Sequence, residues 1–80
     1  MTSEDIVDIF LADSGAYILT EVFHGFDSYI GRVVKIGEDG KRTVAFSASF
    51  IDKDKAAAYT RSVALRLVSE SGIEYMEVIK

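Results

Sequence analysis

The chain lacks cysteine and carries a single histidine, His24. Without thiols it cannot form a disulfide, a Cys-ligated zinc site or a redox-active cysteine pair. No apolar run exceeds four residues, as in Ile9 to Ala12, whereas a membrane-spanning helix needs roughly 18. The acidic start, Met-Thr-Ser-Glu-Asp, lacks the basic residues of a signal or transit peptide. These absences predict a cytoplasmic protein that does not associate with membranes and holds no metal or other cofactor.

The chain is short enough to allow only one domain, residues 1–80, with a mass of 8.8 kDa. A compact chain of this mass exposes roughly 4,800 Å² when folded. The composition, 49% apolar and 11% aromatic, argues against disorder. We therefore expect a small globular domain with a thin hydrophobic core.

Lysine and arginine are absent before Arg32. Residues 1–40 hold eight acidic and two basic residues, a net charge of −6, and residues 41–80 hold five acidic and seven basic residues, a net charge of +2. A solvated acidic surface explains this asymmetry, and so does an acidic face for a basic protein partner. Direct nucleic-acid binding is disfavoured, because its usual footprint is a basic patch.

The first predicted element is a short amphipathic helix from Ser3 to Asp13. Glu4 and Asp5 at its start suit the positive end of a helix dipole, and apolar side chains recur along one stripe. Gly15 would end this helix. A strand over Ile6 to Ala12 is the alternative, because isoleucine and valine are common in strands.

Three strands are predicted next, over Ala16 to Phe23, Tyr29 to Ile36 and Arg42 to Ile51. The Asp39-Gly40 pair favours a hairpin between the second and the third. The first of these strands is apolar on both faces, so its second face is expected to pack on the N-terminal helix or on another protein. The third alternates most clearly, with one face formed by Val44, Phe46, Ala48 and Phe50.

A long helix is predicted from its N-cap, Asp52, to about Ser71, with Gly72 ending it. Its apolar stripe contains Ala56, Thr60, Val63, Ala64, Leu67 and Val68. Ile73 to Ile79 would add a strand at the sheet edge. The expected fold is α+β, a two-layer sandwich of order α-β-β-β-α-β in which the long helix covers an antiparallel meander. The face expected beneath this helix holds Val44, Phe46, Phe50, Ile30 and Val34.

Motifs for catalysis or ligand binding are missing from the sequence. Gly37 to Thr43 lacks the glycine spacing and the Ser or Thr of a phosphate-binding loop. Glu38-Asp39 and Asp52-Lys53-Asp54 supply too few oxygen ligands for calcium. His24 and Asp27 share a loop, but adjacent loop residues seldom hold a nucleophile, a base and a carboxylate in productive order. We therefore expect no enzymatic activity.

The expected partner-binding residues are the acidic side chains of the first half, together with two amphipathic groups in one loop. They would contact lysine and arginine of a partner protein with a basic surface. The set comprises Glu4, Asp5, Asp8, Asp13, Glu21, His24, Phe26, Asp27, Glu38 and Asp39.

The predicted order of helix, three-strand meander and helix over residues 3–71 resembles a double-stranded-RNA-binding domain. That family binds phosphates with a lysine-rich start to its last helix, whereas this chain has Asp52-Lys53-Asp54-Lys55 there. The resemblance implies RNA binding, as a third alternative, through Lys53, Lys55, Arg61 and Arg66.

A second resemblance covers the stretch from Tyr29 through the Glu38-Asp39-Gly40-Lys41 turn, the Ala56-Ala57-Ala58 helix and the closing strand Ile73 to Ile79. This stretch is similar to small acidic phage and mobile-element proteins, including some anti-CRISPR proteins. The resemblance implies a stoichiometric inhibitor that covers a basic nucleic-acid-binding surface of its target, and it assigns no residue a role. The leading hypothesis is therefore a non-catalytic protein-binding module. The runner-up is a homodimeric structural or regulatory domain that pairs through its sheet or its N-terminal helix.

Overall fold

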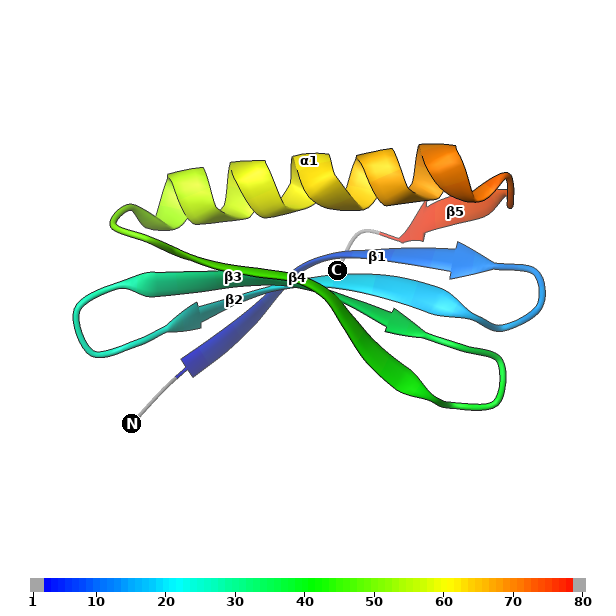
Figure 1. Ribbon diagram of the computed structural model, residues 1–80, viewed down its shortest axis with the longest axis horizontal. Coiled ribbons are helices and arrows are strands. Elements are labelled where there is room, and N and C mark those ends of the chain that lie inside the picture. Colours follow the sequence, from blue (N-terminus) through cyan, green and yellow to red (C-terminus); the bar gives the residue numbers. More distant parts are fainter. Residues whose placement is uncertain (1–2, 79–80) are drawn as a thin grey trace.

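The strands of this protein form one antiparallel sheet in the order β4-β3-β2-β1-β5, and a helix packs along one face of it (Figure 1). The computed structural model describes residues 3–78, with side chains described from Ile6 onward. The fold is α+β, as the sequence predicts. In chain order the elements are β1 (Ser3–Ala12), β2 (Tyr17–His24), β3 (Tyr29–Ile36), β4 (Arg42–Phe50), α1 (Lys53–Ser71) and β5 (Tyr75–Val78).

The prediction of a helix from Ser3 to Asp13 is wrong, because this segment forms strand β1. β1 lies between β2 and β5, with Phe10 in the core beside α1 and Leu11 on the opposite face. A strand that is apolar on both faces has a nearly continuous run of apolar residues. Such a run also contains apolar residues at the spacing of an amphipathic helix, so the periodicity does not distinguish the two structures. Gly15, with φ of 96°, turns the chain from β1 into β2 instead of ending a helix. The resemblance to a double-stranded-RNA-binding domain, which needs a helix here, is contradicted as well.

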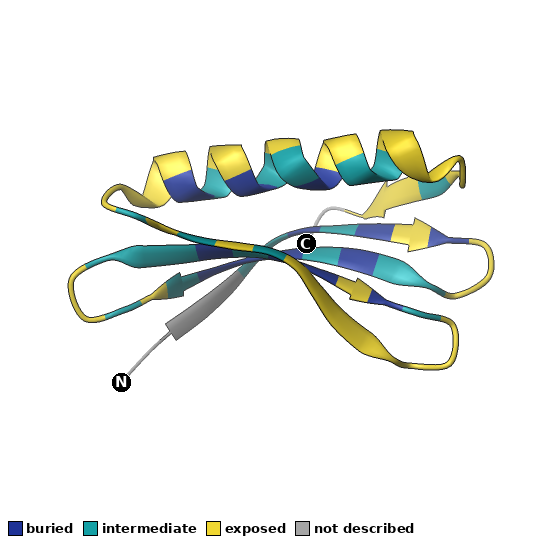
Figure 2. Cartoon of the chain, in the orientation of Figure 1, coloured by how far each residue is buried: buried dark blue, intermediate teal, exposed yellow. Residues whose placement is uncertain are grey.

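Helix α1 has the ends that the sequence predicts. The Asp52 carboxylate accepts hydrogen bonds from the backbone amides of Asp54, at 2.7 Å, and Lys55, at 3.2 Å. The helix ends at Gly72. The buried inner face coincides with the predicted stripe (Figure 2), and it contains Ala56, Thr60 and Ala64.

Gly31 lets α1 lie close to β3. A Cβ atom at this position would overlap the Thr60 hydroxyl oxygen and would lie 3.3 Å from the Ala56 carbonyl oxygen. Glycine inside a strand often marks such a close approach of another element. The contact between helix and sheet therefore depends on the missing side chain at position 31.

A β-bulge interrupts the pairing of β3 with β4. Val33 pairs with Phe46, but the next residue, Val34, pairs with Val44, so Ala45 has no opposite residue. An extra residue in one strand reverses the alternation of side chains beyond it. Val44 and Phe46 therefore lie on opposite faces of the sheet, although the sequence predicts one shared face.

The predicted face beneath the helix is correct for the two phenylalanines only. Phe46 and Phe50 both contact the Tyr59 ring of α1, each with ring centroids 5.7 Å apart. Ile30 and Val34, like Val44, lie on the opposite face, where their cross-strand partners also lie. The face of β3 with more isoleucine and valine, which contains Ile30, Val34 and Ile36, is the open one, and α1 packs instead on the face of Gly31 and Val33.

The overall dimensions reflect a helix that packs on only one face of the sheet. The molecule is elongated, with extents of 38 × 21 × 21 Å. Its accessible surface of 5354 Å² exceeds the roughly 4,800 Å² of a compact chain of this mass. The core between α1 and the sheet is correspondingly small, centred on Phe10, Ile18, Val33 and Ala64.

Candidate protein-binding surface

Helix α1 covers one face of the sheet, and no other element within residues 3–78 covers the second (Figure 1). We call this second side the open face. The middle of the open face is shielded by its own side chains, since Val34 is fully buried. Exposure is greatest toward the borders, from 37% at Leu11 of β1 to 66% at Met76 of β5. The apolar side chains of the open face are Ile6, Ile9, Leu11, Tyr17, Leu19, Phe23, Ile30, Val34, Ile36, Val44, Met76 and Val78.

Glu21 lies on the open face with a side chain that is only 3% exposed. Its carboxylate oxygen Oε1 accepts a hydrogen bond from Arg42 Nη2 at 3.2 Å and lies 3.4 Å from Arg32 Nε. The Arg32 guanidinium also stacks over the Phe23 ring, 4.2 Å from its centroid. Glu21 is thus engaged by two arginines of the same molecule, and this ion-pair cluster joins β2, β3 and β4.

Asp8 is equally buried, but on the helix side of the sheet. Its carboxylate pairs with the guanidinium of Arg61, which also pairs with Glu77 at 2.9 Å. Asp8 Oδ1 also accepts a hydrogen bond from the backbone amide of Ile9 at 2.9 Å. This network ties α1 to β1 and to the short strand β5, so Asp8 stabilises the fold rather than facing a partner.

The β1–β2 and β3–β4 turns lie at the same end of the sheet (Figure 1), and both turns contain acidic residues. The C-terminal end of α1 and the start of β5 lie at this same end. Lys41 is a neighbouring base in the β3–β4 turn. We call the acidic end the set Asp13, Glu38, Asp39, Glu70 and Glu74, all of them exposed.

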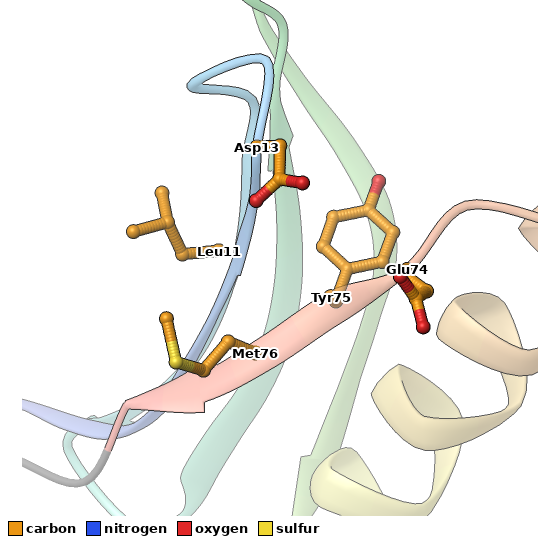
Figure 3. A pocket seen from close by; sticks show the side chains of 5 residues that line it. All are labelled: Leu11, Asp13, Glu74, Tyr75 and Met76. Carbon is orange, nitrogen blue, oxygen red and sulfur yellow. The ribbon is translucent and has the colours of Figure 1, made fainter.

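A surface groove of about 420 Å³ opens between β1 and β5 beside the acidic end (Figure 3). Leu11 and Met76, which are paired across the two strands, project together and form its apolar part. Asp13, Glu74 and Tyr75 complete the lining. Lysine and arginine lay their methylene stems on apolar surface and keep the charged head in contact with polar groups. The groove therefore matches the chemistry of a basic side chain from another protein.

The β2–β3 loop lies at the opposite end of the sheet. His24 stacks on Tyr29, with ring centroids 4.7 Å apart and ring planes 10° from parallel. Phe26 is fully exposed in this loop, and Asp27 is exposed beside it. Ile51, in the connection from β4 to α1, is 93% exposed at the same end of the sheet. This end therefore exposes two large apolar side chains, Phe26 and Ile51, beside the exposed acidic residue Asp27.

The predicted partner-binding residues are divided among separate parts of the molecule. Asp8 and Glu21 are engaged in internal ion pairs, and His24, Phe26 and Asp27 lie at the loop end. Asp13, Glu38 and Asp39 belong to the acidic end. The side chains of Glu4 and Asp5 lie outside the part that the structure describes.

Comparisons with known protein families, with curated protein sequences and with solved structures find no match to this chain. Within residues 3–78, no helix is both long and apolar enough to span a membrane. The side chains described by the structure include no group of three His, Cys, Asp or Glu residues placed to hold a metal ion.

Proposed function

We propose that this chain is a non-catalytic protein-binding module that docks through its open face and acidic end onto a basic protein surface. The observation that supports this most strongly is the one-sided cover of the sheet. Apolar side chains on β1, β4 and β5 stay exposed although the chain has a helix of 19 residues that packs on the other face. Exposed apolar surface bordered by polar groups is characteristic of protein interaction sites.

Charge supports a basic partner. The chain has a formal net charge of −4, and the acidic end adjoins the exposed apolar residues of β1 and β5. An arginine or lysine of the partner would enter the groove, with its stem against Leu11 and Met76 and its charge near Asp13. A buried arginine of this kind is a frequent energetic anchor of protein interfaces.

A basic protein surface is the usual footprint of nucleic-acid binding. The specific form of the function that we propose is therefore a stoichiometric inhibitor that occupies such a surface on its target. This is the function that the resemblance to anti-CRISPR proteins implies.

Direct RNA binding has weaker support. Arg61 is paired with two carboxylates, so it adds little to a phosphate-binding surface. Lys53 and Lys55 at the start of α1 alternate with Asp52 and Asp54. Nucleic-acid affinity comes largely from lysine and arginine that neutralise phosphates, and here carboxylates lie among them.

Site-specific photo-crosslinking in the native host tests this function. A photoreactive residue at Leu11, on the open face, should capture the target, whereas the same residue at Leu65, on the outer side of α1, should not. The two positions are exposed to similar extents, 37% and 42%, so they form a matched pair. The captured protein, once purified, should lose its bound nucleic acid as about one equivalent of the module is added.

Equal capture from the two positions would contradict docking through the open face. If the captured protein keeps its nucleic acid at several equivalents of the module, the inhibitor form of the proposal is wrong. If the target loses its nucleic acid because the module binds the RNA itself, the result would instead support the RNA-binding alternative.

A further inference from the structure

β4 is an edge strand, hydrogen-bonded to β3 on one side and to no other strand among residues 3–78. From Thr43 to Phe50 it contains no charged residue and no proline. Edge strands of soluble proteins usually carry such residues, or are very short, which prevents pairing with another chain. The other edge follows this rule, because β5 has four residues and includes Glu77. The bulge at Ala45 interrupts only the first part of β4, so five regular residues remain free to pair.

The regular part of β4 is symmetric in sequence. Phe46-Ser47-Ala48-Ser49-Phe50 is identical in both directions. When two identical strands pair antiparallel, a two-fold axis relates them, so that residue i meets residue j and residue j meets residue i. With the axis at Ala48, each Phe46 would meet Phe50 of the second copy, and each Ser47 would meet Ser49 of the second copy. Aromatic and hydroxyl pairs directly across from each other both stabilise a sheet.

We propose that two copies of this chain pair through β4, antiparallel and centred on Ala48, and so join their sheets into one. The absence of charge in the paired stretch means that no like charges are opposed across the axis. The pairing uses the strand edge, so it does not depend on the partner proposed for the open face.

The helix side of β4 carries an exposed aromatic surface that the second copy would cover. A groove of about 440 Å³ is lined by Phe50, Lys55, Ala58 and Tyr59, and Tyr59 is 55% exposed. In the paired arrangement, Phe46 of the second copy lies directly beside Phe50, at the border of this groove. The rings of Phe46, Phe50 and Tyr59, already in contact within one molecule, would extend into a cluster shared by both copies.

The size of this interface predicts a reversible dimer. Five paired residues and one aromatic groove per copy bury less than the roughly 1,200 Å² at which stable interfaces begin. We therefore expect a dissociation constant on the order of 10 µM. Sedimentation velocity over about 5 to 500 µM should show the mass rising from 8.8 kDa toward twice that value.

Paired substitutions at two exposed positions test the register. The double variant Ser47→Lys with Ser49→Lys opposes lysines across the axis and should stay monomeric throughout this range. The double variant Ser47→Lys with Ser49→Glu opposes a lysine with a glutamate on both sides of the axis, so it should dimerise at least as tightly as the unmodified chain. Ser69→Lys, on the exposed side of α1, adds a lysine away from the edge and should leave dimerisation unchanged.

The outcomes separate cleanly. An unmodified chain that stays monomeric at the highest concentration overturns the proposal. A dimer that survives the two lysines pairs through another surface, which overturns it as well. Loss of the dimer in both double variants would show that β4 pairs in a different register and would reject the axis at Ala48. Circular dichroism and urea unfolding of each variant at low concentration verify that the monomer is folded.

Discussion

Replacing Gly31 with alanine should destabilise the protein, although glycine is normally a poor strand residue. The flexibility of glycine in the unfolded chain favours alanine by about 0.5–1 kcal/mol where the backbone permits it. Here the added Cβ would overlap the Thr60 hydroxyl and approach Phe50 at 3.2 Å and the Ala56 carbonyl at 3.3 Å. Overpacking of this kind costs typically ~1–3 kcal/mol. We expect the steric cost to exceed this gain, so that Gly31→Ala lowers the free energy of unfolding by about 1–2 kcal/mol.

The Thr60 side chain provides the matched test of that reasoning. Its hydroxyl is buried and has no hydrogen-bond partner among the described residues. Thr60→Ala removes this unpaired hydroxyl, whose burial costs roughly 1–3 kcal/mol, and this change favours folding. It also removes a packed methyl group that contributes about 1 kcal/mol of stability, so the two effects oppose each other. The single change should therefore lie within about 1 kcal/mol of the unmodified protein. In the double variant with Gly31→Ala the overlap is gone, so the combined loss should be at least ~1 kcal/mol smaller than the sum of the single losses.

Urea unfolding followed by circular dichroism measures all four proteins of this double-mutant cycle. The steric account requires a negative coupling between the two positions. If Gly31→Ala is neutral or stabilising, or if the two changes are additive, the close approach of α1 to β3 is not as the structure has it.

The remaining predictions concern packing, the buried carboxylate and the acidic end. Phe46→Ala should lower the free energy of unfolding in urea, measured at low concentration, by about 2–3 kcal/mol, which is less than the ~3–5 kcal/mol of a fully buried phenylalanine because Phe46 is half-buried. Ser47→Ala, on the open face, should change the free energy of unfolding by less than about 1 kcal/mol. Equal losses for the two variants would refute the strand register. Glu21→Gln removes the carboxylate that pairs with two arginines and should lower the free energy of unfolding by about 1–3 kcal/mol. This loss is smaller than for breaking a fully buried ion pair, because both arginine side chains are partly exposed to water. No loss would mean that the cluster does not stabilise the sheet. Asp13→Lys should slow association with the captured target and flatten its salt dependence, whereas Asp27→Lys, at the opposite end, should not; equal effects would reject the acidic end as the recognition surface.

The elements that the sequence predicts correctly are those specified by neighbouring residues. The Asp52 carboxylate caps α1 by accepting hydrogen bonds from backbone amides two and three residues later in the chain, and Gly72 ends the same helix. The Asp39-Gly40 pair lies in the turn between β3 and β4. The final strand lies at a sheet edge, as expected. The helix ends and the turn depend on contacts within a few residues, so their signal is local, whereas the edge position of β5 depends on its pairing with β1.

The features that the sequence did not indicate depend on distant parts of the chain. Segment 3–12 is a strand because its backbone pairs with β2 on one side and with β5 on the other, and β5 comes more than sixty residues later. The bulge at Ala45 has no local signature, yet it moves Val44 to the open face. The acidic residues are split between internal ion pairs and the surface for the same reason, because only the pairing of β2 with β3, and of β3 with β4, brings Arg32 and Arg42 to Glu21. Glu70 and Glu74 join the acidic end through the fold, although they lie in the more basic half of the sequence.

The affinity of the captured target for two arginine variants tests the docking surface most directly. Met76→Arg would fill the groove beside Asp13 and form an internal ion pair with it, which blocks an incoming basic side chain. Leu65→Arg places the same charge on the outer side of α1, at a position that is also exposed. In isothermal titration calorimetry we expect at least about a tenfold weaker affinity for Met76→Arg and a change within about twofold for Leu65→Arg. Unchanged affinity for Met76→Arg, or a larger loss for Leu65→Arg, would contradict docking through the open face.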